Sequence, residues 1–182
     1  MNPLKTAVIG VGYLGRFHAQ KFAKIQDSDL LGVIDVDEDR GTEVGKELGV
    51  PYFKSLDALP TLPDAVSIAV PTIHHFETAK NCLEKGIHVL LEKPFASNIE
   101  QSQTLLDLSI EQKLCLQIGH LERFNPVFRE FQKSIKKLPN EDASKEIQYP
   151  QFIESVRIAP FPKRGTDVDV ILDLMIHDID LI

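Results

Sequence analysis

Residues 5–15 read Lys-Thr-Ala-Val-Ile-Gly-Val-Gly-Tyr-Leu-Gly, an apolar, strand-like run that enters the pattern Gly-x-Gly-x-x-Gly. In such a loop Gly10 permits a tight turn, Gly12 lets the backbone approach a pyrophosphate, and Gly15 lets the following helix pack against the strand. The first turn of that helix offers N–H groups to the anion. The pattern therefore predicts a dinucleotide-binding loop rather than an empty structural turn. The cofactor contacts expected here are Gly10, Gly12, Tyr13, Leu14 and Gly15.

An acidic residue stands where the adenosine ribose of a dinucleotide would lie. Asp35 follows the apolar run 30–34 and comes 35 − 12 = 23 positions after Gly12, close to the roughly 20 typical of the ribose-binding carboxylate. Because a carboxylate repels a 2′-phosphate, Asp35 favours NAD. The alternative is that Asp35 only caps the next turn. Arg40 is near enough in the sequence to contact the cofactor as well, so use of NADP remains an alternative.

A lysine follows another apolar run, residues 87–91, in the motif Glu92-Lys93-Pro94. The carboxyl edge of a parallel sheet is where ligands bind, so Lys93 is a candidate proton-handling group. A cationic nicotinamide ring beside it would favour its neutral, proton-accepting form. Pro94 makes the residue before it extended and can take a cis bond. The alternative is an ordinary loop lysine at the surface.

Short apolar runs alternate with helix-patterned stretches over the first 120 residues, which is typical of repeated strand–helix–strand units. The expected strands cover residues 5–9, 30–34, 52–53, 65–70, 87–91 and 114–118. The expected helices cover residues 14–26, 40–48 and 77–85, the last ended by Gly86, and a further helix begins near Asn98. The pattern predicts an α/β fold, a doubly wound parallel sheet of the Rossmann type forming an NAD(P)-binding domain over residues 1–120.

The pattern changes after Gly119, so residues 121–182 are expected to begin a second, α+β domain. An amphipathic helix is expected over residues 126–137 and one alternating strand over residues 152–158. A helical pattern runs over residues 168–182 with no stop signal after it. We therefore expect this domain to be incomplete and the chain to be a piece of a longer protein.

Composition excludes several classes of partner. The 182 residues carry a formal net charge of -7, with 27 acidic against 20 basic residues, and no basic block marks a nucleic-acid or anionic-membrane surface. Cys82 and Cys115 lie in apolar stretches, so we expect buried thiols in a reducing compartment. No apolar stretch approaches the roughly 20 residues of a membrane helix, and the start lacks a signal-peptide pattern. We expect a cytoplasmic protein.

Two polar residues share one face of the last expected helix. Asp173 and His177 are four positions apart, so their side chains project from the same side, with Asp178 and Asp180 close behind. A simple surface pair is the plain alternative. Asp-x-x-x-His alone supplies too few ligands for a metal, and no metal site is expected.

Taken in this order, the glycine loop, Asp35, Glu92-Lys93-Pro94 and the pair Asp173 and His177 resemble the glucose-fructose oxidoreductase, inositol dehydrogenase and MocA family. The resemblance covers the whole chain. Residues 70–72 (Val-Pro-Thr), followed by His75, and residues 86–89 (Gly-Ile-His-Val) strengthen it. Further cofactor contacts that it implies are Pro71, Thr72, His75, Glu92 and Lys93.

The resemblance also implies an activity. In this family a Rossmann domain is followed by a domain whose open, mostly antiparallel sheet covers the nicotinamide and supports oligomerisation. Lys93, Asp173 and His177 match the family's active-site residues. A substrate hydroxyl would lose its proton to His177 or Lys93 as hydride passes to the nicotinamide, while Asp173 orients the substrate or the base.

Residues 119–126 (Gly-His-Leu-Glu-Arg-Phe-Asn-Pro), with Arg157, Pro160 and Asp167, are similar to the members that oxidise the 3-hydroxyl of a UDP-N-acetylhexosamine. An arginine there could grip a diphosphate or form a salt bridge between domains. The expected substrate contacts are Lys93, Glu122, Arg123, Asn125, Arg157, Asp173 and His177. Dehydrogenation of a free sugar or an inositol-like polyol, non-catalytic NAD sensing, and a biliverdin-reductase-like activity are the alternatives, although the pair Asp173 and His177 argues against the last.

Overall fold

The computed structural model describes residues 2–136, 152–156 and 169–182. The chain divides into two compact units, Met1–Gly119 and His120–Ile182, and each is taken here by itself. No described helix combines the length and apolar character needed to cross a membrane.

The first unit contains a six-stranded sheet in which every neighbouring pair of strands is parallel. Its strands are β1 (Leu4–Ile9), β2 (Ser28–Ile34), β3 (Tyr52–Phe53), β4 (Ala65–Ile68), β5 (His88–Leu91) and β6 (Leu116–Ile118). They are ordered β3-β2-β1-β4-β5-β6, so the direction of winding reverses between β1 and β4. The expected doubly wound Rossmann sheet is confirmed.

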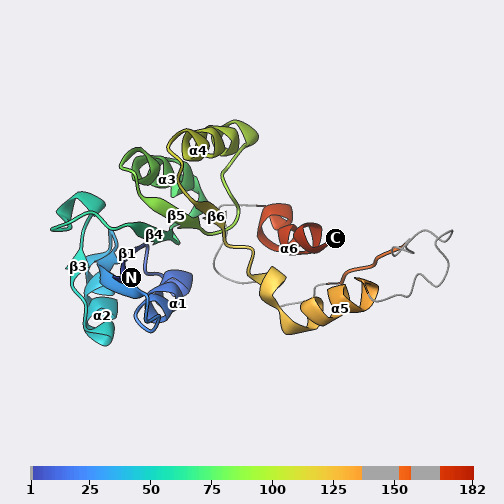
Figure 1. The fold of residues 1–182 in the computed structure, drawn as a ribbon, viewed down its shortest axis with the longest axis horizontal. Helices are drawn as coiled ribbons and strands as arrows, with labels where there is room; N and C mark the ends of the chain where they lie inside the picture. Colours follow the sequence, from blue (N-terminus) through green and yellow to red (C-terminus); the bar gives the residue numbers. More distant parts are fainter. Residues whose placement is uncertain (1, 137–151, 157–168) are drawn as a thin grey trace. The chain divides into compact units, whose positions relative to one another are not determined.

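Helices cover both faces of this sheet (Figure 1). They are α1 (Tyr13–Phe22), α2 (Glu38–Leu48), α3 (His75–Glu84) and α4 (Ile99–Glu111), with short 3-10 helices η1 (Leu56–Ala58) and η2 (Thr72–His74). Asn98 caps α4 by accepting a hydrogen bond from the Gln101 N–H (2.9 Å). Gly86 follows α3 with a φ of 77°, which glycine adopts without steric cost. Both helix boundaries lie where the sequence places them.

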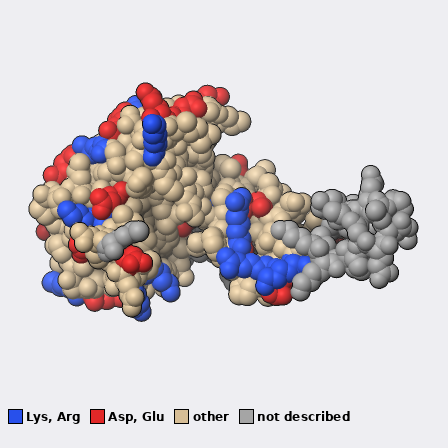
Figure 2. All heavy atoms as spheres, viewed as in Figure 1, with Lys and Arg blue, Asp and Glu red and all other residues tan. Residues whose placement is uncertain are grey.

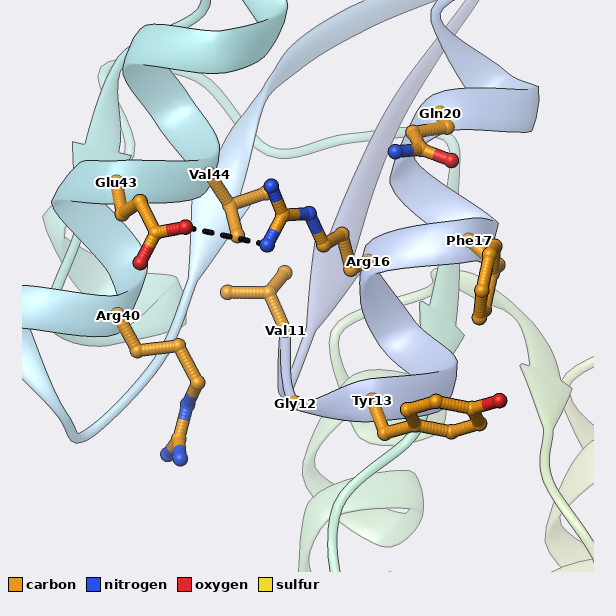
Figure 3. Close-up of a pocket in the computed structure, with 9 residues that line it drawn as sticks. All are labelled: Val11, Gly12, Tyr13, Arg16, Phe17, Gln20, Arg40, Glu43 and Val44. Atoms are coloured by element: carbon orange, nitrogen blue, oxygen red, sulfur yellow. Dashed lines mark hydrogen bonds and ion pairs between the residues drawn. The ribbon is translucent and has the colours of Figure 1, made fainter.

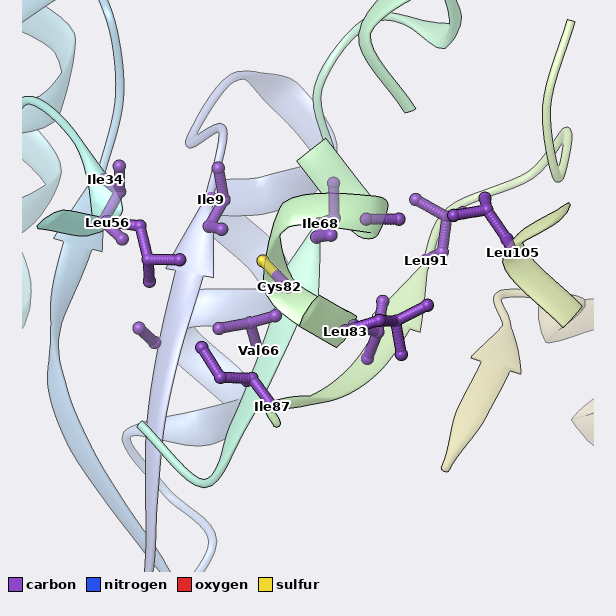
Figure 4. Close-up of a cluster of buried hydrophobic side chains, with 13 residues drawn as sticks. Ile9, Ile34, Leu56, Val66, Ile68, Cys82, Leu83, Ile87, Leu91 and Leu105 are labelled. Carbon is purple, nitrogen blue, oxygen red and sulfur yellow. The ribbon is translucent and has the colours of Figure 1, made fainter. Parts of the chain in front are cut away.

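The core forms two clusters because successive side chains of a strand point to opposite faces. Ala7 and Ile9 of β1 pack on the side of α3 and α4, whereas Val8 packs on the side of α1 and α2. Figure 4 shows the first cluster, with Cys82 and Leu83 pointing from α3 onto the sheet. Burial on both faces explains why the central strands are apolar throughout.

On the face drawn in Figure 2, acidic and basic side chains of the described residues are interspersed over the first unit. Ion pairs also join helices of this unit, for example Arg16 of α1 with Glu43 of α2 (3.1 Å).

The regular elements described in the second unit are helical. Its elements are the 3-10 helix η3 (Leu121–Phe124), α5 (Pro126–Lys136), the π-helical turn η4 (Ile171–Met175) and α6 (Ile176–Leu181). The expected strand over residues 152–158 is wrong for residues 152–156, which have no regular secondary structure; residues 157–158 lie outside the described part. Alternation alone does not make a strand, because a strand also needs a neighbour to pair with.

The expectation that both thiols are buried is half wrong. Cys82 is fully buried, whereas Cys115 is exposed. Cys115 directly precedes β6, which is the edge strand of the sheet formed by the described residues. Burial raises the pKa of the Cys82 thiol to about 12.

We predict that a disulfide reagent modifies Cys115 in the native protein and leaves Cys82 unmodified. With a pKa of about 12, about one Cys82 thiol in 10⁴ would be ionised at pH 8. Thiol titration at pH 8 should count one reactive group before denaturation and two in guanidinium chloride. Equal rates of reaction for wild type and Cys115→Ser would contradict this assignment.

Candidate functional site

The glycine loop after β1 is crowded at two positions and open at the third. Gly10 has a φ of 81°, and a Cβ there would lie 2.8 Å from Val70 Cγ1. A Cβ on Gly15 would overlap the carbonyl oxygen of Gly10, whereas a Cβ on Gly12 would meet no atom within 4 Å. The loop is thus closely packed against β4 and α1, yet it leaves space beside Gly12 for a ligand. These residues fit a dinucleotide pyrophosphate.

Asp35 lies at the carboxyl end of β2 and is 4% exposed. Its carboxylate accepts hydrogen bonds from the N–H groups of Val11 (2.8 Å) and Asp37 (2.9 Å). Arg40 donates to both oxygens, from Nε (3.1 Å) and Nη2 (2.8 Å). Burial alone would raise the pKa of Asp35, but the hydrogen bonds from Arg40 and the two N–H groups outweigh it and lower the pKa.

A pocket of about 510 Å³ opens beside the glycine loop and Arg40, which binds the Asp35 carboxylate. Figure 3 shows residues of the loop, α1 and α2 around it, with Arg16 directed to Glu43 and Arg40 extended from α2. Its lining residues are Val11, Gly12, Tyr13, Arg16, Phe17, Gln20, Arg40, Glu43 and Val44. Tyr13 and Arg40, two of the expected cofactor contacts, therefore border an open volume.

Lys93 follows β5 at the same edge of the sheet as the glycine loop and Asp35, because all the strands are parallel. It is half-buried, and its bond to Pro94 is cis. The preceding Glu92 is 5% exposed, and its Oε2 accepts a hydrogen bond from the Lys93 N–H (3.2 Å). The carboxyl edge thus carries a phosphate-sized space, a carboxylate and an amine.

Two expected cofactor contacts have side chains that face the protein interior. Glu92 Oε1 lies 3.0 Å from His18 Nε2. His75, which is 1% exposed, places Nδ1 2.7 Å from the Pro94 oxygen and Nε2 3.0 Å from the Val70 oxygen. Thr72 is also buried, whereas Pro71 is exposed. The two contacts of His75 connect the loops that follow β4 and β5.

Sequence reasoning missed the partners of Glu92. His18 of α1 places Nδ1 2.6 Å from the hydroxyl of Ser67 on β4, so one imidazole spans α1, β4 and the Lys93 motif. A serine inside an apolar strand and a histidine one position before the buried Ala19 were the available signals.

In the second unit Asp173 lies in the π-helical turn η4 and His177 in α6. Both residues are half-buried and stand four positions apart in a continuous helical segment. The N–H of Asp173 bonds to the Asp169 oxygen (2.9 Å). Single π-turns within helices frequently occur at functional sites. The convergence of Asp173 and His177 with Lys93 stays a prediction.

Three expected substrate contacts have partners inside the second unit. Arg123 Nε donates to Asp180 Oδ2 (2.8 Å), and Nη2 bonds to Oδ1. Asn125 Nδ2 donates to Glu122 Oε2 (3.1 Å). The hydrogen bond from Arg123 lowers the pKa of Asp180. The sequence left open that Arg123 forms a salt bridge between domains. Arg123 does form a salt bridge, but its partner Asp180 lies within the second unit. Arg157, Pro160 and Asp167 lie outside the described residues.

Within residues 2–136, 152–156 and 169–182, no group of three or more His, Cys, Asp or Glu side chains is arranged to hold a metal ion.

A parallel sheet of this strand order, with a glycine loop after β1 and a buried carboxylate after β2, defines a dinucleotide-binding Rossmann domain. Residues 4–120 match the model of the GFO/IDH/MocA family, described as an oxidoreductase family with an NAD-binding Rossmann fold. This chain belongs to that family.

The chain is 43% identical over 181 residues to the UDP-N-acetylglucosamine 3-dehydrogenase of Acidithiobacillus ferrooxidans, covering 100% of this chain and 54% of the relative. A solved structure of that enzyme aligns with a TM-score of 0.85, over 100% of this chain and 55% of the other. The scyllo-inositol 2-dehydrogenase (NAD(+)) of Bacillus subtilis is 27% identical over 99% of this chain and 53% of its own length. The chain thus spans about half the length of these relatives.

A solved scyllo-inositol dehydrogenase from Lactobacillus casei, with bound NAD(H) and scyllo-inositol, is 29% identical and has a TM-score of 0.69. The alignment covers 74% of this chain and 41% of that one. The shared fold therefore extends to a relative that holds this cofactor.

We predict that Gly12→Ala weakens NAD binding at least tenfold without destabilising the protein. The backbone of Gly12 is extended, and a Cβ there would meet no protein atom within 4 Å, but it would occupy the space expected for the pyrophosphate. Calorimetric titration with NAD and thermal unfolding check both parts.

Gly15→Ala is the matched comparison, because its Cβ would overlap Gly10 and should lower the melting temperature. Unchanged NAD affinity in a folded Gly12→Ala protein would contradict the proposed placement of the pyrophosphate.

We predict that Asp35→Asn lowers the free energy of unfolding by about 1–3 kcal/mol at pH 7, as expected for hydrogen bonds to a charged group. Because the folded-state pKa is lowered, the contribution of Asp35 is fully present above the unfolded pKa of about 3.9 and is lost as pH falls through the folded pKa. Urea unfolding at pH 7 and pH 3 should therefore give a smaller difference between variant and wild type at pH 3. An equal difference at both values would refute the ionic role of Asp35.

Proposed function

We propose that this protein is a cytoplasmic, NAD-dependent dehydrogenase that oxidises the 3-hydroxyl of a UDP-N-acetylhexosamine. The observation that carries the proposal is the 43% identity to a UDP-N-acetylglucosamine 3-dehydrogenase, which extends over the whole chain and so includes residues 120–182. The arrangement of the glycine loop, Asp35 and Lys93 along one sheet edge supports it. As the family resemblance implies, the full-length protein would be a homo-oligomer, with a Rossmann domain over residues 1–120 and a substrate domain from residue 121.

Each residue at the edge has a distinct task in this proposal. The N–H groups of Tyr13 and Leu14 would bind the pyrophosphate at the open side of Gly12. Asp35 would accept a hydrogen bond from the adenosine ribose, and this requires Arg40 to give up one of its bonds to the carboxylate. A bound NAD supplies a nicotinamide carbon that accepts hydride.

The remaining residues would act on the substrate. Lys93 Nζ would bind the oxygen of the reacting hydroxyl and take or relay its proton. His177 would be the alternative proton acceptor, and Asp173 would orient the substrate or the base. Glu122, Arg123, Asn125 and Arg157 would contribute contacts to the sugar nucleotide, and any contact of Arg123 with a diphosphate would compete with its salt bridge to Asp180.

A free polyol is the second candidate substrate. It is favoured by similarity to inositol dehydrogenases, among them the Thermotoga maritima myo-inositol 2-dehydrogenase, at 30% identity over 98% of this chain and 53% of that relative. Lys93 would have the same task with either substrate, because both reactions remove a proton from a hydroxyl and a hydride from its carbon.

We predict that Lys93→Ala lowers kcat of the full-length protein at least 10²-fold, the scale of acid–base catalysis, while the Kd for NAD stays within threefold of wild type. NADH formation should be followed with UDP-N-acetylglucosamine, free sugars and inositols. Lys80→Ala is a matched control, because Lys80 lies on α3 in a surface pair with Glu84.

Retention of full activity by Lys93→Ala would refute the proposed role. Binding of NAD without reduction by any compound in the panel would instead favour a non-catalytic, NAD-sensing protein.

A further inference from the structure

Two imidazoles, the half-buried His18 and the buried His75, connect the main chain around Lys93 to β4 and to the turn after it. Before the lysine, Glu92 contacts His18, and His18 contacts Ser67 of β4. After the lysine, the Pro94 oxygen contacts His75, which also contacts the Val70 oxygen just beyond β4.

The first connection runs from Ser67 through His18 to Glu92 and the Lys93 N–H. Glu92 Oε1 lies 3.0 Å from His18 Nε2, so a proton on that nitrogen faces the carboxylate. His18 Nδ1 lies 2.6 Å from the Ser67 hydroxyl, which donates to it when Nε2 alone carries the ring proton. Glu92 Oε2 in turn accepts from the Lys93 N–H. Ser67 is fully buried and Glu92 is 5% exposed, so bulk water does not substitute for these contacts.

The space around Glu92 is closed from a second direction. Gly119 follows β6, and a Cβ there would lie 2.9 Å from Glu92 Oε1. The N–H of Gly119 bonds to the Leu91 oxygen (2.8 Å), which fixes that backbone beside the carboxylate. Glu92 is therefore held between α1 and the end of β6.

The second connection joins two loops through one ring. His75 is 1% exposed, and its two nitrogens lie 2.7 Å and 3.0 Å from carbonyl oxygens of Pro94 and Val70. Both oxygens only accept, so a neutral ring donates to one of them, and which one depends on the tautomer. With either tautomer the ring lies between the turn after Lys93 and the turn after β4. Neither histidine needs to reach the substrate to have this effect.

We propose that His18 and His75 are positioning residues that fix the main chain on either side of Lys93 and so set where its amine lies. This inference rests on the proposed function of Lys93. It assigns a task to the half-buried His18 and to the buried Ser67 and Glu92, which no step of the proposed reaction uses directly.

The test compares two substitutions at His18 in the full-length protein. His18→Gln keeps a side-chain N–H that can face Glu92, whereas His18→Leu keeps bulk and removes that donor. We expect His18→Leu to speed hydrogen exchange of the Lys93 amide at least tenfold and to lower kcat at least tenfold, with KM for NAD within twofold of wild type. His18→Gln should restore both quantities to within threefold of wild type.

Rescue by glutamine separates positioning from a general loss of structure, because both variants lack the ring. Wild-type exchange and kcat in His18→Leu, or a His18→Gln protein as impaired as His18→Leu, would overturn the inference. If the wild type oxidises no compound in the panel, the proposed function fails, and the exchange rates of the Lys93 amide alone then decide for or against positioning.

A smaller change covers the case in which His18→Leu does not fold. Ser67→Ala removes the hydroxyl that fixes the ring, and it should speed exchange of the Lys93 amide at least threefold. Ser109→Ala is its control, because Ser109 is also buried but bonds to Leu106 on α4; it should leave that exchange unchanged. Identical exchange rates in the two serine variants would contradict the role of His18.

His75→Leu and His75→Gln test the other side of Lys93 in the same way. His75→Leu should speed hydrogen exchange of the Lys93 amide at least tenfold and lower kcat at least tenfold. His75→Gln can still donate to the Pro94 oxygen, so it should recover more than half of each change on a logarithmic scale. No difference between His75→Leu and wild type would restrict the inference to His18 and overturn the part that concerns His75.

Discussion

The close parallel pairing of β1 with β4 is the constraint on which the rest of the site depends. Ile9 lies opposite Ile68 in this pair, so the chain leaving β1 turns directly against the chain leaving β4. Gly10 has no room for a side chain there, and neither has Gly15, which packs against Gly10. The approach brings the first turn of α1 to the sheet edge, where its N–H groups can face an anion.

The same pairing determines what surrounds the lysine. Because β4 also pairs with β5, the chain that carries Lys93 leaves the sheet beside the chain that follows β4. The hydroxyl of Ser67 and the carboxylate of Glu92 are both buried, and both contact His18. Burial of a polar group costs free energy unless the group has a polar partner. These side chains can therefore lie in the interior because each contacts the next.

Sequence reasoning recovered what short-range patterns encode. The glycine spacing, the position of Asp35 and the alternation of apolar runs predicted the loop, the sheet and the order of the elements, because each depends on residues near one another in the chain. Contacts between distant residues left no such pattern. Ser67 lies 49 positions from His18, and Asp180 lies 57 positions from Arg123. The exposure of Cys115 likewise depends on its place beside the edge strand rather than on its apolar neighbours.

The central claim is that Lys93 handles the proton of a sugar hydroxyl at the carboxyl edge of this sheet. A crystal structure of the full-length protein with NAD and UDP-N-acetylglucosamine tests it most directly, through the distance from Lys93 Nζ to the oxygen of the 3-hydroxyl. The account predicts a separation of about 2.6–3.2 Å, within hydrogen-bond reach. A sugar bound beside the nicotinamide with that oxygen beyond about 6 Å from Nζ, too far even for one bridging water, would contradict it.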